Sequence, residues 1–79
     1  MKVTPDNVRE YIQQGLDCEH VEVEGDGRHF EAVIVSKEFD GKGKLQQQRL
    51  VFQILGGKMD VIHALSMKTF TPQQWAEQD

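Results

Sequence analysis

A hairpin pattern near the middle of the chain constrains the fold more than any other feature. Val21 and Val23 alternate with glutamates, which is typical of a strand with one buried face. Residues 25–27 combine two glycines with an aspartate, a turn composition, and residues 30–36 then form a more continuously apolar run. We therefore predict two antiparallel strands, of which the second is central in a sheet.

Helical patterns flank this hairpin on both sides. Thr4 suits an N-cap with Pro5 at the first helical position, and apolar residues then recur on one face until about Leu16. Residues 45–55 predict a second helix, which the glycines at 56 and 57 end and which turns residues 46–49 mostly outward. The apolar side chains on its inner face are Leu50, Val51, Ile54 and Leu55.

A third strand and a short final helix complete the pattern. Residues 60–68 predict the strand, with an extra helical turn near residues 57–59. Thr71 and Gln74 have capping-box spacing, and Phe70 with Trp75 occupies the hydrophobic-staple positions. The predicted fold class is α+β, in the order α-β-β-α-β-α, with a three-stranded mixed sheet and the helices on one face.

Topology brings two distant histidines to one end of this sheet. Strands joined through a helix favour parallel pairing, so the second and third strands start at the same edge. His29 begins the second strand and His63 lies early in the third. Cys18 and His20 precede or begin the reversed first strand, so we expect them on the order of 15 Å or more away, at about 3.3 Å per strand residue.

His63 stands where a strand that only packs would carry an aliphatic residue. Imidazole changes charge near neutral pH and coordinates borderline metals, so this position is the first candidate for chemistry. The common alternative is a structural histidine, and His29 has the matching alternative of a polar residue that closes the hairpin. Cys18 and His20 have the residue types of a nucleophile pair, but no orienting acid or oxyanion hole accompanies them, so no enzyme is expected.

Length and composition narrow the class of protein further. A chain of 79 residues forms one small domain, residues 1–79, with little room for a deep internal site. It carries no long uncharged apolar run and no signal-peptide core, so we expect a cytoplasmic protein without membrane contact. The single cysteine excludes an internal disulfide, and one cysteine with scattered histidines does not match a closed zinc site.

Four segments in order carry a resemblance to a known family. They are residues 39–42 (FDGK), 48–51 (QRLV), 62–66 (IHALS) and 68–72 (KTFTP) followed by Trp75. Together they resemble the successive signatures of the BolA-like family over nearly the whole chain. The turn at residues 25–30 (GDGRHF) resembles its IbaG branch.

The resemblance implies a fold like the class II KH domain and a non-enzymatic adaptor that partners a monothiol glutaredoxin around a shared [2Fe-2S] cluster. His63 matches the family's ligand in the third strand. The second family ligand is a cysteine or histidine in the loop between the first two strands; this loop is short and has no cysteine, so His29 is the matching residue. The glutaredoxin cysteine and a glutathione thiol would supply the other ligands, and the IbaG likeness implies a role in acid-stress resistance.

Nucleic-acid binding is the alternative function, because the KH-like fold and proposals for BolA relatives as transcriptional regulators also imply it. The candidate contacts are Lys42, Lys44 and Arg49. A KH domain grips nucleotides with a GXXG loop, and the glycines at 41 and 43 have the wrong spacing for it. With a net charge of −4 we expect at most weak nucleic-acid contact, and a solvated surface explains these cations equally well.

Overall fold

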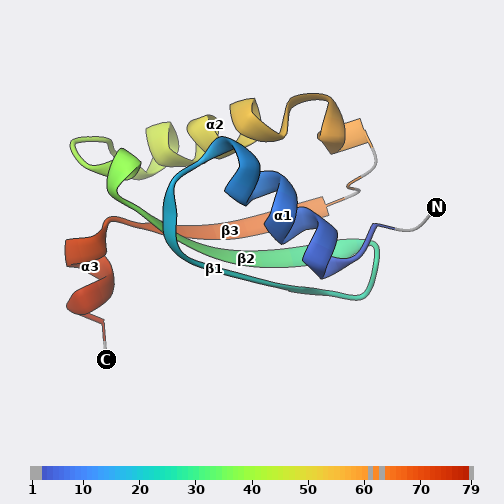
Figure 1. Cartoon of the computed structure of the whole chain (residues 1–79), viewed down its shortest axis with the longest axis horizontal. Helices are drawn as coiled ribbons and strands as arrows, with labels where there is room; N and C mark the ends of the chain where they lie inside the picture. Colours follow the sequence, from blue (N-terminus) through green and yellow to red (C-terminus); the bar gives the residue numbers. More distant parts are fainter. Residues whose placement is uncertain (1–2, 61, 63, 79) are drawn as a thin grey trace.

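The computed structural model describes residues 3–60, 62 and 64–78. Their elements follow the predicted order, with one short 3₁₀ helix added after the second strand and another at the predicted extra turn (Figure 1). In chain order they are α1 (Pro5–Gly15), β1 (Cys18–Gly25), β2 (His29–Ser36), the 3₁₀ helix η1 (Lys37–Phe39), α2 (Lys44–Leu55), the 3₁₀ helix η2 (Gly56–Asp60), β3 (Ala64–Phe70) and α3 (Pro72–Ala76).

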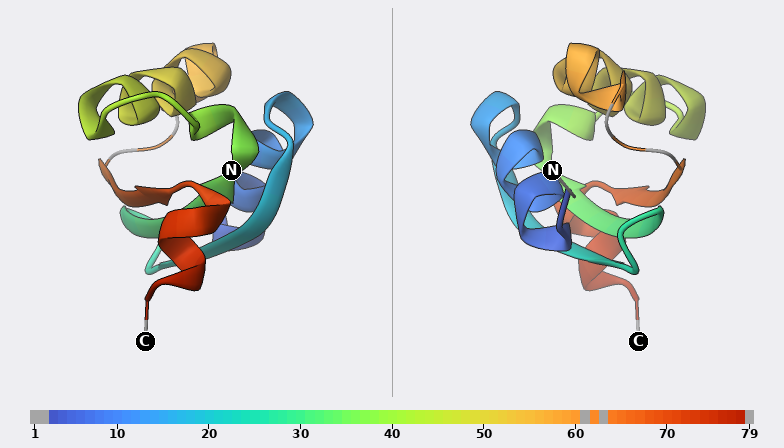
Figure 2. Two further views of the ribbon diagram at one scale, coloured as in Figure 1. Left: turned by 90° about the vertical axis from the view of Figure 1, so that its left-hand side faces the viewer. Right: turned by 90° about the vertical axis from the view of Figure 1, so that its right-hand side faces the viewer.

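The sheet has the predicted topology. Its strand order is β1-β2-β3, with β1 antiparallel and β3 parallel to the central β2. α1 and α2 cover one face side by side, whereas α3 lies at the end of the sheet and on the side away from α2 (Figures 1 and 2). The α+β class and the three-stranded mixed sheet are confirmed, and the third helix is the element whose position differs from the one-sided arrangement.

Local signals set the first helix where the sequence predicts it. Thr4 caps α1, because its hydroxyl accepts a hydrogen bond from the Asn7 backbone and the Asn7 side chain accepts one from the Thr4 backbone. Val8 and Ile12, one helical turn apart, are fully buried. They place the apolar face of α1 on the sheet.

β1 begins earlier than predicted. Cys18 belongs to the strand, and the register shifts between Cys18 and His20. A bulge of this kind adds one residue to one strand and breaks strict alternation. Cys18 and Val21 therefore both contact the core, while His20 and Glu22 face the other side.

α2 buries one residue that the sequence pattern assigned to the surface. The prediction turned Gln46–Arg49 mostly outward, but Gln47 is only 1% exposed. It precedes Val51 by four residues, so it lies on the same inner face of the helix. Its amide nitrogen donates to the backbone carbonyl of Lys42 (2.8 Å) and its oxygen accepts from the Thr69 hydroxyl (2.7 Å). These bonds allow the polar side chain to be buried.

The third strand lies further along the chain than predicted. Gly56 ends α2 with φ 48°, and the chain continues as η2 to Asp60, which confirms the extra helical turn. β3 then runs from Ala64 to Phe70 rather than over residues 60–68. It reaches Phe70 because Thr69 and Phe70 pair with Ile34 and Val35 of β2.

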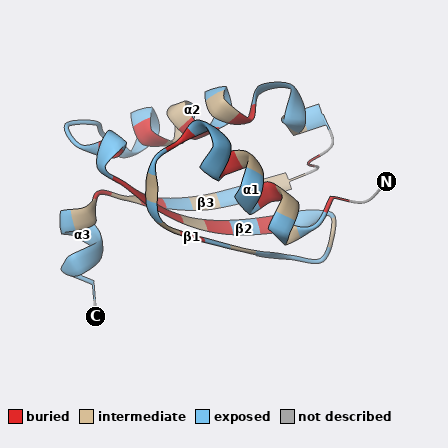
Figure 3. Cartoon of the chain, viewed as in Figure 1, coloured by how far each residue is buried: buried red, intermediate tan, exposed pale blue. Residues whose placement is uncertain are grey.

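The core lies between the sheet and the helix pair. Figure 3 shows buried positions along β2 and on the inner sides of α1 and α2, whereas α3 has no buried residue. The largest fully buried apolar side chains are Phe30, Phe39, Ile12, Ile34 and Leu55. Burial of each contributes about 1.5–3 kcal/mol, so this layer dominates the stability of the fold.

Candidate histidine site at the sheet edge

A rigid turn positions His29 at the start of β2. One carboxylate oxygen of Asp26 accepts hydrogen bonds from the backbone amides of Arg28 (2.9 Å) and His29 (3.0 Å). Gly27 has φ 101°, a conformation that favours glycine. A β-carbon on Gly25 would lie 2.3 Å from the His29 carbonyl oxygen, so the two strands close tightly there. The glycines of this turn are predicted from the sequence, but this role of Asp26 is not. The signal for it is an aspartate two and three residues before the amides that its side chain binds.

The Asp26 carboxylate adds charge beside the histidine. The backbone hydrogen bonds from His29 and then Arg28 lower the pKa of Asp26 below its ordinary value of 3.8. The group is therefore ionised at neutral pH. A fixed negative charge thus lies next to His29 at this edge.

The parallel pairing brings the start of β3 against His29. His29 is paired with Ala64, and the Arg28 carbonyl accepts a hydrogen bond from the Ala64 amide (3.1 Å). Ala64 directly follows His63 in the sequence. His63 itself lies outside the described residues, so its role as a ligand stays a prediction.

His29 is chemically accessible. The residue is exposed, and the Asp26 bonds engage its backbone amide rather than its imidazole. A neutral imidazole in this setting can coordinate a borderline metal through a ring nitrogen. The donor type at this edge therefore fits an iron ligand supplied by His29.

Cys18 and His20 lie at the opposite end of the sheet, as the topology predicts. Cys18 pairs with Ser36 and His20 with Val35, at the far end of β2 from His29. Burial, then the charges of Glu38 and Asp17, raise the pKa of the Cys18 thiol from 9.0 to about 11. A thiol that stays protonated at neutral pH is a poor nucleophile and a poor metal ligand.

The three candidate nucleic-acid contacts do not form one surface. Lys42 and Arg49 line the same shallow groove on α2, together with Gln46, Leu50 and Gln53. The ammonium group of Lys44 instead contacts the Thr69 carbonyl oxygen and lies 4.5 Å from the centre of the Phe70 ring. Lys44 thus holds α2 to β3, and two of the three predicted cations remain in the groove.

Among residues 3–60, 62 and 64–78, no three or more His, Cys, Asp or Glu side chains are grouped so that they could hold a metal ion. Within the same ranges, no helix has the length and apolar character needed to cross a membrane.

Comparison with known proteins identifies the family of this chain. The family model described as BolA-like protein matches residues 12–74. BolA-like protein 2 of Mus musculus is 41% identical over 99% of this chain and 96% of its own length. Acid stress protein IbaG of Escherichia coli is 34% identical over 87% of this chain and 84% of its own length. The DNA-binding transcriptional regulator BolA of Haemophilus influenzae is 38% identical over 70% of this chain and 54% of its own length.

Solved structures give the same result. A BolA homologue from Coxiella burnetii superposes with a TM-score of 0.83 at 42% identity, covering 95% of this chain and 99% of that one. A BolA-like protein from Babesia bovis reaches a TM-score of 0.84 at 37% identity, covering 94% and 91%. Family model, relatives and structures each span most of the molecule. The chain belongs to the BolA-like family.

Proposed function

We propose that this protein is a non-enzymatic cytoplasmic adaptor that shares a [2Fe-2S] cluster with a monothiol glutaredoxin and its glutathione, for cluster trafficking or sensing. The pairing of His29 with Ala64 supports this proposal most directly, because it sets the exposed imidazole beside the residue that follows His63. A relative named acid stress protein IbaG supports a role in acid-stress resistance.

The number of ligands explains why a partner is needed. A [2Fe-2S] cluster takes four protein or thiol ligands, and imidazoles in place of two thiolates make it less negative and raise its reduction potential. His29 and His63 are this chain's two candidates at the sheet edge. Cys18 and His20 belong to the other end, so the glutaredoxin cysteine and the glutathione thiol complete the set.

Acidity would act on this site through the imidazoles. A histidine coordinates iron only through a deprotonated ring nitrogen, so protons compete with the cluster as pH falls. Asp26 stays ionised beside His29 in this range, because its pKa is lowered. Retention of the cluster in the heterocomplex is thus expected to decrease with acidification.

The test is to mix the purified protein with a cluster-loaded monothiol glutaredoxin and to record visible absorption and circular dichroism. We expect a spectrum distinct from that of the glutaredoxin alone, saturating at one adaptor per glutaredoxin. Cys18→Ser is the matched control and should give the same spectrum, since this thiol lies at the far end of β2. An unchanged glutaredoxin spectrum at excess adaptor would contradict the proposal.

Nucleic-acid binding is the second candidate, favoured by the relative named DNA-binding transcriptional regulator BolA and by the groove that Lys42 and Arg49 share. Binding through these cations would weaken steeply with salt, and Lys42→Glu or Arg49→Glu would each reduce the salt slope by about one unit. The net charge of −4 predicts that the isolated protein shows no specific DNA binding at physiological salt. Tight binding that Arg49→Glu abolishes and His29→Ala leaves unchanged would favour the regulator.

A further inference from the structure

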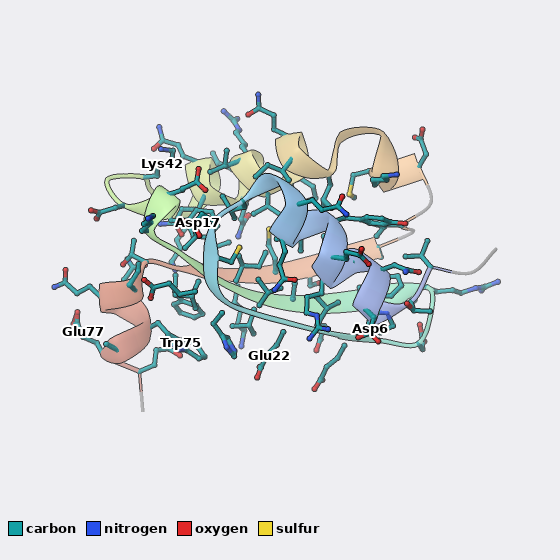
Figure 4. The ribbon with its side chains drawn as sticks, in the orientation of Figure 1. Asp6, Asp17, Glu22, Lys42, Trp75 and Glu77 are labelled. Atoms are coloured by element: carbon teal, nitrogen blue, oxygen red, sulfur yellow. The ribbon has the colours of Figure 1, made fainter. Side chains whose placement is uncertain are left out.

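β3 is an edge strand of the sheet. The strand order β1-β2-β3 gives it one neighbour, and its other side has no strand among the described residues (Figure 2). α3 does not cover this side. Its Trp75 ring lies against the face that α1 and α2 leave open, with centroids 5.0 Å from His20 of β1 and 5.5 Å from Phe70 of β3, on the same side of the sheet as Glu22 (Figure 4). A strand edge of this kind presents backbone groups with which a further strand can pair.

The hydrogen bonds of β3 determine which of its residues face this edge. The Ala64 amide donates to the Arg28 carbonyl (3.1 Å), so the backbone groups of Ala64 point to β2. In a parallel pair, alternate residues direct both backbone groups to the same neighbour. Ser66 therefore also bonds to β2, whereas Leu65 and Met67 direct their N–H and C=O groups to the outer edge.

The contact made by Lys44 agrees with this assignment. Thr69 lies two residues beyond Met67, so its carbonyl also faces the edge, and this oxygen is the one that the Lys44 ammonium of α2 contacts. The edge is therefore closed at Thr69. The loop, cap and side-chain hydrogen bonds of the described residues leave Leu65 and Met67 without a partner on this side.

One side of α2 forms an apolar wall above the open stretch. Gln48 and Phe52 follow Lys44 along the same side of the helix, at steps of four residues. Phe52 is about 12 Å along the helix from Lys44, which equals about four residues of a strand. Because α2 and β3 run in opposite directions (Figure 1), this distance places Phe52 level with Leu65. The Phe52 side chain is 40% exposed, so its ring offers free apolar surface there.

The charges on these two elements favour an acidic occupant. α2 and β3 contain Lys44, Arg49 and Lys68 but no aspartate or glutamate, although the whole chain has a net charge of −4. Lys68 is exposed on the open face of the sheet, directly after Met67. A second copy paired through the same edge would bring two lysine-bearing strands together, and like charges in neighbouring strands are destabilising. An acidic strand would meet attraction instead.

We propose that β3 accepts an extended acidic segment of a partner protein as a fourth strand, paired with Leu65 and Met67. Alternate side chains of the segment would pack against Phe52, and the carboxylates between them would reach Lys68. The outward groups at strand spacing and the apolar wall favour a peptide over nucleic acid, and Lys44 is already engaged with Thr69. This inference does not rest on the glutaredoxin partnership.

The first probe is an acetylated, fluorescein-labelled peptide of alternating valine and glutamate. It is titrated with the full chain, and its fluorescence anisotropy is measured. We expect saturable binding, and slower hydrogen exchange of the Leu65 and Met67 amides when the peptide is bound. The Ser66 and Lys68 amides already bond to β2 and should exchange at nearly unchanged rates. Absence of peptide binding would overturn the proposal.

Methylated peptides test whether the segment pairs as a strand. One version carries N-methyl groups on its valines and another carries them on its glutamates. Only one of these two sets of amides can face β3, so one version should bind about tenfold or more weakly and the other should bind like the unmodified peptide. Equal affinities of the two methylated peptides would overturn the fourth strand.

Variants of the chain locate the binding edge. Met67→Pro removes one outward N–H but keeps the bonds to β2, and we expect about tenfold weaker binding, whereas Met67→Ala should bind within about twofold of the wild type. Lys68→Glu should weaken binding by about fivefold. Lys58→Glu makes the same change of charge beside Tyr11 of α1 and is the matched control.

Far-ultraviolet circular dichroism checks that each variant is folded, and Lys68→Glu with the methylated peptides keeps the test decisive if Met67→Pro does not fold. Equal weakening by Lys68→Glu and Lys58→Glu would overturn the proposal. Two further results would also overturn it. Binding of oligothymidine in place of the peptide would assign the edge to nucleic acid, and a dimer of the free chain that Met67→Pro dissociates would assign it to a second copy.

Discussion

At the scale of single residues, the buried amide of Gln47 joins three parts of the chain. It bonds to the loop before α2 through the Lys42 carbonyl and to β3 through the Thr69 hydroxyl. Both Gln47 and Thr69 are 1% exposed, so neither can exchange its partner for water. Their bond therefore fixes the position of α2 relative to β3, in addition to stabilising the contact.

Replacing one partner of this bond should be costly. Gln47→Leu leaves the buried Thr69 hydroxyl unpaired, and we expect a loss of about 1–3 kcal/mol in the free energy of unfolding by urea. The double variant Gln47→Leu with Thr69→Val removes both polar groups and should recover part of that loss. Gln48→Leu, on the exposed side of α2, is the control. This role would be contradicted if the double variant lost more free energy of unfolding than the two single variants lose in total.

Cys18 illustrates how burial controls the chemistry of a single side chain. With its pKa raised to about 11, only about one thiol in a thousand is ionised at pH 8. Alkylation by iodoacetamide should therefore be slow in the native protein, should accelerate with rising pH up to about 11, and should become fast in urea. Rapid alkylation of the folded protein at pH 7 would contradict the placement of Cys18.

At the scale of elements, the turn between β1 and β2 determines where His29 lies. Three features fix this turn. They are the two backbone hydrogen bonds that the Asp26 carboxylate accepts, the positive φ of Gly27 and the close approach of the strands at Gly25. The carboxylate contributes to the turn above its ordinary pKa of 3.8 and loses this contribution as pH falls through its lower folded value. The turn is therefore expected to stay intact across the range in which histidines titrate.

A methyl group at Gly25 should disturb this turn specifically. Its β-carbon would meet the His29 carbonyl oxygen at 2.3 Å, so the strands must shift. We expect Gly25→Ala to lower the free energy of unfolding by about 1–3 kcal/mol and to move the backbone amide signal of His29 in NMR spectra. Gly57→Ala is the control, since nothing lies within 4 Å of its added β-carbon. Equal effects of the two substitutions would refute the tight closure.

Most of the elements could be predicted because their signals are local. Capping residues, glycines and apolar periodicity mark α1, the hairpin, α2 and α3 within a few residues. The structure differs from the prediction where a contact with a residue distant in the sequence determines the local structure. The bulge brings Cys18 into β1, pairing with β2 extends β3 to Phe70, and the Trp75–His20 stack holds α3 on the open side. No pattern within a single segment records such contacts.

At the scale of the whole molecule, the parallel crossover from β2 to β3 is what assembles the candidate site. The rule that strands joined through a helix run parallel predicted that His29 and the start of β3 share an edge, and the pairing of His29 with Ala64 confirms it. The antiparallel pairing predicted for the first two strands placed Cys18 and His20 at the opposite end, and the register confirms this too. The separate use of Lys44 could not be foreseen, because its contacts with Thr69 and Phe70 depend on how α2 is placed over β3.

In the proposed function, this chain gives histidine nitrogens to a cluster shared with a glutaredoxin. The most direct measurement is pulsed electron paramagnetic resonance of the reduced heterocomplex, with ¹⁵N-histidine in this chain and an unlabelled glutaredoxin. We expect strongly coupled ¹⁵N signals, weakened by His29→Ala, removed in the variant that also carries His63→Ala, and unaffected by His20→Gln. A heterocomplex cluster without strongly coupled ¹⁵N, or with couplings that survive loss of both His29 and His63, would contradict ligation by these two histidines.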